Sequence, residues 1–234
     1  MWKLISAILT LAVVVTIAPV LWNVTQAPPS EGEISHMLPW QIEHLDDGHT
    51  RALGLSPGVD PLSAARPIFG PDAEIAIVAP PGRPMLLEAY YESVNAGFIT
   101  GRLILTADLN DDTLAAMRAR ALRESYMEST TRKIRLHPDD LATARTAPIR
   151  VITFIPSANL DEEVVSARFG AAGERIEGEG GVVHLLYPNK GLDIALDGRG
   201  RAVMQYVAPR DFARLASPLA TPSTSTTIDP SGAR

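Results

Sequence analysis

A segment that occurs twice constrains the fold of this chain more than any other feature. Residues 60–74 and 160–174 each hold a short apolar run that ends in Phe-Gly, with a glutamate four positions beyond the glycine. The repeated residues are Phe69, Gly70 and Glu74 in the first copy and Phe169, Gly170 and Glu174 in the second. Two such copies predict an internal duplication, in which each copy begins a similar structural unit.

The second copy carries complete signals for a short amphipathic helix. Asp161 is a residue type that caps helix N-termini, and Glu162 and Glu163 place negative charge in the first turn, where the helix dipole favours it. Gly170 can adopt the positive φ that ends a helix. The expected buried face follows a 3.6-residue period and consists of Leu160, Val164, Val165 and Phe169.

The first copy differs because it has a proline inside the expected helix. Asp60 is the expected cap, and Pro61 suits the first helical position. Pro67 lacks the backbone N–H that a helix interior requires, so we expect this helix to be kinked or shortened.

Beyond each helix the spacing of apolar residues changes from a period of 3.6 to a period of 2, which predicts strands. The expected strands are 74–79, 85–94, 98–107, 174–177, 182–187, 192–196 and 201–207. Turn sequences such as Pro80-Pro81-Gly82 separate them. The alternation of apolar and polar residues within these strands favours an antiparallel sheet with helices on one face and solvent on the other.

Strand-like sequence also precedes each helix. Residues 149–155 lead into the second copy, and two alternating runs around Asp47-Gly48 predict a hairpin before the first. Between the two units the sequence predicts a helix over 111–125, a short strand over 133–136 and a helix over 138–147. The expected fold is therefore α+β, with two tandem repeats of strand, helix and antiparallel meander.

A short helix that ends in Phe-Gly, followed by a meander with aromatic and glycine punctuation, resembles the SmpA/OmlA (BamE-like) family. In tandem, the unit is similar to the β-lactamase-inhibitor protein fold. The resemblance covers roughly residues 53–107 and 151–207. It implies a concave sheet as the contact face. The assembly lipoproteins of that family carry a lipidated cysteine, and this chain has no cysteine.

The first residues of the chain have the composition of a membrane span. Leu4–Trp22 is apolar and uncharged, and as a helix with a rise of about 1.5 Å per residue it would be roughly 28 Å long. Lys3 precedes it and Glu31 and Glu33 follow it, which predicts a cytoplasmic N-terminus and a periplasmic remainder. A cleaved signal peptide is the alternative interpretation.

These features divide the chain into five parts. They are a transmembrane anchor (1–22), a linker (23–38), a first repeat with a helical insert (39–148), a second repeat (149–215) and a tail (216–234). We expect the tail to be disordered because it is rich in Ser, Thr and Pro.

Charge and motifs exclude several classes of function. The net charge is −6 at pH 7 and no basic stripe is present, which argues against nucleic-acid binding. The lack of cysteine excludes disulfides and thiolate zinc sites. The sequence shows no P-loop, no Rossmann glycine pattern and no Gly-x-Ser-x-Gly motif. We therefore expect neither a cofactor nor a metal, and no catalytic residue is predicted.

The polar face of the expected meanders is the candidate binding surface. Strand alternation assigns to it Glu88, Tyr90, Glu92, Thr100, Arg102, His184, Asp193 and Gln205. Tyrosine beside charged residues on an exposed sheet is typical of protein recognition. The sequence predicts a non-catalytic interaction module or accessory subunit at the bacterial inner membrane, whose partner is another envelope or inner-membrane protein.

Three alternatives remain open at this point. A periplasmic hydrolase would use His184 with a carboxylate. A module for small ligands or lipids would need an apolar cavity between helix and sheet. The polar face would also look the same if it were solvated and bound nothing.

Overall fold

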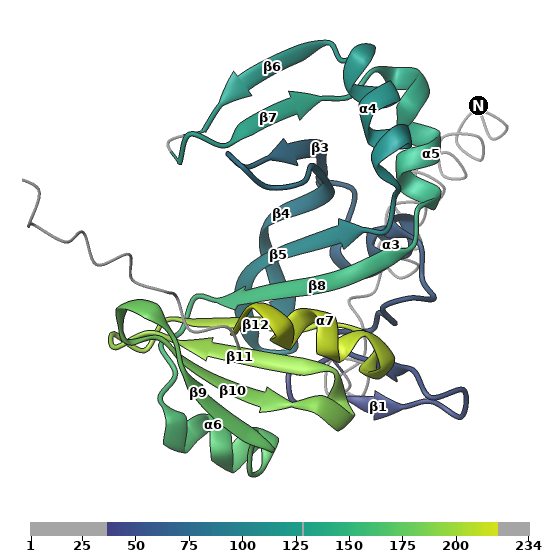
Figure 1. Cartoon of the computed structure of the whole chain (residues 1–234). Coiled ribbons are helices and arrows are strands. Elements are labelled where there is room, and N and C mark those ends of the chain that lie inside the picture. Colours follow the sequence, from purple (N-terminus) through teal and green to yellow (C-terminus); the bar gives the residue numbers. More distant parts are fainter. Residues whose placement is uncertain (1–36, 128, 220–234) are drawn as a thin grey trace, which may run out of the picture. The chain divides into compact units, whose positions relative to one another are not determined.

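A continuous antiparallel sheet organises the described part of the chain. The computed structural model describes residues 37–127 and 129–219, and within them ten strands pair in the order β6-β7-β3-β4-β5-β8-β12-β11-β10-β9 (Figure 1). The strands are β3 (Glu74–Ala79), β4 (Leu86–Ala96), β5 (Ile99–Ala107), β6 (Arg123–Tyr126), β7 (Arg132–Arg135), β8 (Ile149–Pro156), β9 (Glu174–Glu177), β10 (Val183–Tyr187), β11 (Leu192–Leu196) and β12 (Ala202–Tyr206). The predicted α+β class is confirmed.

The helices are short. They are η1 (Leu62–Ala65), α3 (Arg66–Phe69), α4 (Asp111–Ala119), η2 (Pro138–Asp140), α5 (Leu141–Thr146), α6 (Glu162–Phe169), η3 (Glu179–Gly181), η4 (Pro188–Lys190), η5 (Pro209–Asp211), α7 (Phe212–Ala216) and η6 (Ser217–Leu219). A separate hairpin of β1 (Glu43–His44) and β2 (Thr50–Arg51) turns at Gly48, as expected. None of the helices in the described residues is long and apolar enough to cross a membrane, and Leu4–Trp22 lies outside those residues.

Strand β8 lies at the centre of the sheet and joins its two meanders. It pairs with β5 on one side and with β12 on the other, so β3-β4-β5 and β9-β10-β11-β12 are parts of the same hydrogen-bonded surface. The predicted boundary between the repeats, at residue 149, coincides with the first residue of β8. The predicted anchor, residues 23–36 of the linker and residues 220–234 of the tail lie outside the described residues.

Local sequence signals place the helix of the second copy. The Asp161 carboxylate accepts a hydrogen bond from the Val164 N–H at 2.7 Å, and Gly170 ends the helix with a φ of 81°. The predicted cap and end are therefore correct. The predicted buried face is wrong at Val164, which is 42% exposed, because the helix packs through Val165 and Phe169 instead.

The first copy is split at its proline, as predicted. A 3₁₀ turn, η1, precedes a single α-helical turn, α3, that contains Pro67. The predicted cap is wrong: the Asp60 carboxylate accepts the N–H of Ser56 at 2.7 Å, and Pro61 precedes η1 without a side-chain cap.

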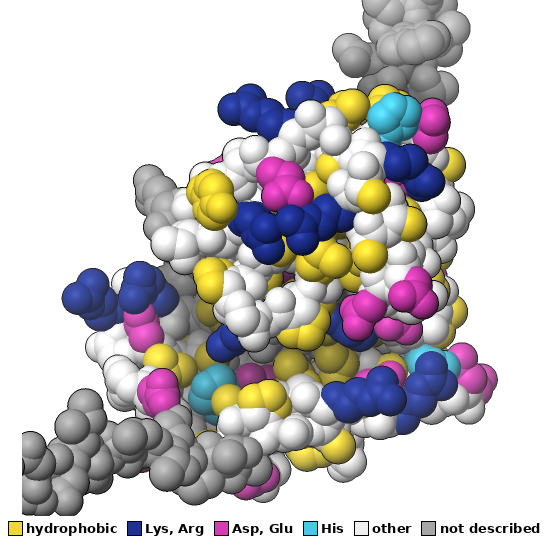
Figure 2. All heavy atoms as spheres, turned by 45° about the horizontal axis from the view of Figure 1, so that its top comes forward, with side chains coloured by type: hydrophobic (Ala, Val, Ile, Leu, Met, Phe, Trp, Pro, Cys, Tyr) yellow, Lys and Arg dark blue, Asp and Glu magenta, His cyan; other side chains and the backbone are white. Residues whose placement is uncertain are grey.

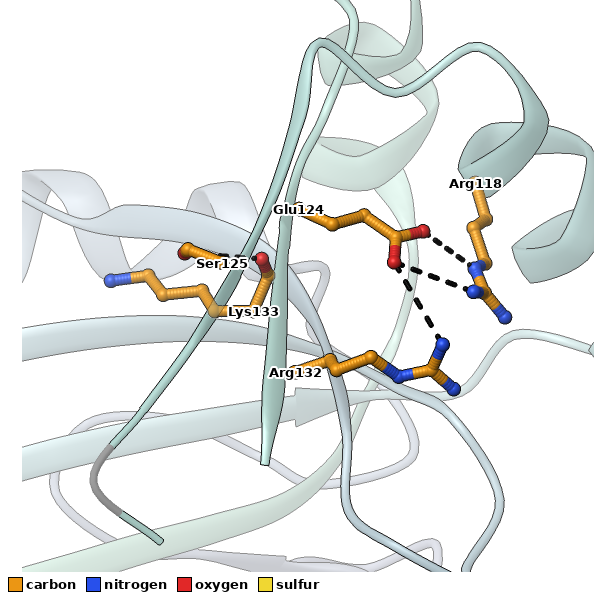
Figure 3. Close-up of polar contacts among 5 residues, drawn as sticks. All are labelled: Arg118, Glu124, Ser125, Arg132 and Lys133. Carbon is orange, nitrogen blue, oxygen red and sulfur yellow. Dashed lines mark hydrogen bonds and ion pairs between the residues drawn. The ribbon is translucent and has the colours of Figure 1, made fainter. Parts of the chain in front are cut away.

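The predicted helix over 111–125 is too long. It ends at Ala119, and Arg123–Tyr126 form strand β6 instead, paired with β7 at the edge of the sheet. Glu124 of β6 links α4 to the hairpin, because it binds Arg118 of α4 at 2.8 Å and lies 3.8 Å from Arg132 of β7 (Figure 3). Pairing between strands has thus overridden local helix propensity.

The main hydrophobic core lies on one face of the sheet. Side chains of β5 and β8, such as Leu103 and Phe154, are fully buried there. They belong to one cluster with Leu62 of η1, Met117 of α4 and Val165 of α6. On the opposite face α7 packs through Phe212 and Leu215 on residues of β8, β9 and β10, and Leu219 of η6 joins this second, smaller cluster. No helix was predicted at the position of α7.

Candidate functional site

The sheet face opposite the main core carries the predicted binding residues. A row of directly paired residues crosses it from one repeated glutamate to the other. The row consists of Glu74, Tyr90, Ile104, Thr153, Gln205, Asp193, Leu186 and Glu174. Paired residues of an antiparallel sheet lie on the same face, so the prediction that Tyr90, Asp193 and Gln205 share one surface agrees with this register.

Tyr90, Glu92 and Arg102 form a polar cluster on the half of this face that β4 and β5 build. The Tyr90 hydroxyl donates a hydrogen bond to Glu92 Oε2 at 2.7 Å. Burial and then the bond to Glu92 raise the pKa of Tyr90, while Arg102 acts in the opposite direction. The cluster therefore places the Tyr90 ring beside a carboxylate, from Glu92, and a guanidinium group, from Arg102. Both charged side chains are exposed.

Thr100 and Glu88 lie on the same half of the face. The Thr100 hydroxyl donates to Asn95 Oδ1 at 3.1 Å across the β4-β5 ladder, beyond an irregularity between Tyr91 and Val94. Glu88 lies between Ala76 of β3 and Thr106 of β5 and is half-buried. Burial raises the pKa of Glu88, and no ion pair formed within residues 37–127 and 129–219 includes it.

His184 and Asp193 form a pair on the other half, where the expectation of an exposed face is wrong. His184 Nδ1 lies 2.9 Å from Asp193 Oδ2, and Asp193 is only 2% exposed. The cause is α7, which crosses β11 and β12 and packs on Leu186, the direct neighbour of Asp193 (Figure 1). Burial raises the pKa of Asp193, and the bond to His184 opposes that rise. The pair is therefore best explained as a buried carboxyl group and its hydrogen-bond partner.

A feature that the sequence interpretation missed lies at the β6 edge. Arg123, Ser125, Lys133 and Arg135 share one face of the β6-β7 hairpin. The sequence signal was present in β7 alone, where Ile134 separates Lys133 from Arg135. In β6 the charged Glu124 stands between Arg123 and Ser125, so no alternation marks that strand, and its residues were assigned to the end of the preceding helix.

Comparison with known proteins does not identify the role of this surface. No family model, no curated protein and no solved structure matches the chain. Among the described residues no group of three or more His, Cys, Asp or Glu side chains is arranged to hold a metal ion. A functional assignment must therefore start from the geometry of the sheet face.

Replacing Glu88 with glutamine is expected to stabilise the fold in a pH-dependent way. Because the folded state raises the pKa of this carboxyl, the unfolded chain loses the proton first as the pH rises, and stability falls between the unfolded and folded pKa values. Glu88→Gln removes that loss. The free energy of unfolding from urea titrations should match wild type near pH 3 and exceed it at pH 7.

The control is Glu163→Gln, which changes an exposed carboxyl on α6. It should show no gain in stability at pH 7, because the charge of Glu163 lies in the first turn of α6, where the helix dipole favours it. A Glu88→Gln variant that is less stable than wild type at pH 7 would contradict the assignment of Glu88 as a carboxyl without an ionic partner.

Proposed function

We propose that this chain is a non-catalytic interaction module, held at the inner membrane by Leu4–Trp22, that binds another envelope protein through the β4-β5-β8 part of its sheet. The observation that carries the proposal is the contrast between the two halves of one face. Helix α7 covers the β10-β11 half and also packs on Val151 near the start of β8. Tyr90 of β4, Ile104 of β5 and Ile155 near the end of β8 are only partly buried among the described residues.

The composition of the uncovered half supports a protein partner. Tyrosine and arginine supply much of the binding energy at protein interfaces, and Tyr90 and Arg102 lie beside each other here. Ile104 and Ile155 add apolar area at the centre, and Glu92 adds a charge at the edge. This arrangement of a partly apolar centre with charged groups around it suits a partner that has a similar mixed surface.

The duplication and the family resemblance fit the same proposal. The two glutamates of the repeated segment end one row of paired residues across the sheet, as expected if both meanders descend from one ancestral unit. A tandem SmpA/OmlA-like protein would use its sheet as a contact face, which is an analogy at the level of the fold.

The proposal predicts that Tyr90→Ala with Arg102→Ala abolishes capture of the partner. Truncating a hot-spot Tyr or Arg costs about 2 kcal/mol or more, so the double variant, losing about 4 kcal/mol, should bind roughly a thousandfold more weakly. The measurement is chemical crosslinking in intact cells, followed by purification of full-length protein from detergent-solubilised membranes.

The matched control is Tyr126→Ala with Arg199→Ala, which removes the same residue types at exposed positions on β6 and in the turn after β11. The control should keep the wild-type crosslinked product. Equal crosslinking by both double variants, with unchanged melting temperatures, would reject the β4-β5-β8 surface as the binding site.

A further inference from the structure

A groove of about 520 Å³ lies on the outer face of β6, β7 and β3. Its polar lining consists of Arg123, Ser125, Lys133, Arg135 and Glu74. Figure 2 shows groups of Lys and Arg side chains, with Asp and Glu side chains beside them, on the face of the molecule that it displays. Three cations and one acid in a single groove leave it with a local positive charge, although the chain as a whole has a net charge of −6.

The register of the hairpin sets like charges against each other. Arg123 pairs directly with Arg135, and Ser125 pairs with Lys133. The Cβ atoms of directly paired residues lie about 5 Å apart, and like charges at such positions destabilise a sheet. The stability of the fold therefore does not explain why two arginines lie opposite each other at these positions.

The nearby acids do not neutralise these two arginines. Lys133 Nζ binds Glu74 Oε2 at 2.5 Å, which occupies the carboxylate of the groove. Glu124 points to one side of the hairpin, where Arg118 and Arg132 bind it, while Ser125 and Lys133, which line the groove, point to the other side (Figure 3).

Glu88 is the next carboxyl across the sheet. Ala76 separates it from Arg135 in the same row, and no ion pair joins the two. Within residues 37–127 and 129–219, Arg123 and Arg135 take part in no ion pair. Two guanidinium groups are thus left beside a hydroxyl group and an ammonium group.

We propose that this groove binds the phosphate group of a phosphate ester. A phosphate between Arg123 and Arg135 would turn their repulsion into two sets of charge-assisted hydrogen bonds, because each guanidinium fork matches two phosphate oxygens. Lys133 Nζ, which already binds Glu74, has further N–H donors on the same face. The Ser125 hydroxyl donates to the Lys133 carbonyl oxygen at 3.4 Å and would exchange that long bond for one to a phosphate oxygen. A carboxylate has only two oxygens and would leave part of this donor set unused.

The same chemistry serves a soluble phosphate ester and the headgroup of a phospholipid. The site adjoins the proposed protein-binding face, since Glu74 pairs with Tyr90, but it does not depend on it. The two proposals are tested with different variants and different probes.

The test uses full-length protein in neutral-detergent micelles at constant ionic strength. Inorganic phosphate, glycerol 3-phosphate and short-chain phosphatidylglycerol are titrated by calorimetry against wild type and against Arg123→Gln with Arg135→Gln. Wild type should bind these probes, and the loss of two charge-assisted donors should weaken binding by about tenfold or more. Tighter binding of phosphatidylglycerol than of glycerol 3-phosphate identifies a lipid headgroup, and equal binding identifies a soluble ester.

The matched control is Arg145→Gln with Arg199→Gln, which makes the same change in net charge at exposed positions on α5 and after β11. The control should bind like wild type. The groove variant should melt no lower than wild type in chloride, because it removes a repulsive pair. The proposal is overturned if wild type binds none of the probes at millimolar concentration, or if both double variants lose binding equally.

Discussion

Gly191→Ala is expected to destabilise the fold by roughly 2–5 kcal/mol, because a left-handed residue and a steric clash coincide at one position. Gly191 follows η4 with a φ of 63°. A Cβ atom there would lie 2.1 Å from the carbonyl oxygen of Val207. Val207 cannot easily move away, since it is 4% exposed and its N–H donates to the Gly191 carbonyl at 2.8 Å. Urea unfolding followed by circular dichroism gives the change in free energy.

Gly82→Ala separates the two contributions. Gly82 also has a positive φ, at 68°, but no atom lies within 4 Å of the position that its Cβ would take. This variant should lose only about 1–2 kcal/mol, which is the effect of the backbone conformation alone. Equal losses at the two glycines would show that the contact with Val207 relaxes without strain.

Phe154→Ala is expected to lower the free energy of unfolding by about 3–5 kcal/mol, as for other large aromatic side chains removed from a core. Phe154 is fully buried in β8, where it pairs with Leu103 of β5 on one side and Met204 of β12 on the other. Because β8 joins both meanders, the whole sheet should lose stability together. Urea unfolding should then keep one transition at a lower midpoint.

Phe98→Ala is the matched control, because Phe98 is 74% exposed. Its effect should stay within about 0.5 kcal/mol. Two separate transitions in Phe154→Ala, with only one of them shifted, would contradict the view that the two meanders unfold as one unit.

Local rules were sufficient for most of the secondary structure. Three strands, 74–79, 174–177 and 192–196, have the bounds that period-2 alternation and turn residues predict. The cap at Asp161 and the break at Pro67 were also predictable, since each depends on backbone groups within a few residues. The eight predicted surface residues were found in the same way, from alternation along single strands.

Contacts between distant segments were beyond those rules. Tyr206 is fully buried, and its hydroxyl donates to the carbonyl oxygen of Pro39 at 2.9 Å across 167 residues of chain. Nothing near Asp193 in the sequence shows that α7 will cover it. Arg123 lies opposite Arg135 only because residues 123–126 form strand β6 and pair with β7, instead of continuing helix α4.

The sequence by itself determined the α+β class, the duplicated helix signals and which residues of each strand share a face, because these follow from the geometry of a few neighbouring residues. Only the tertiary structure decided the position of β8 between the meanders, the covered and uncovered halves of the outer face, and the cationic groove. These features depend on which segments bury their apolar surfaces against one another. The free energy of that burial comes from residues far apart in the chain, so no short stretch of sequence reveals it.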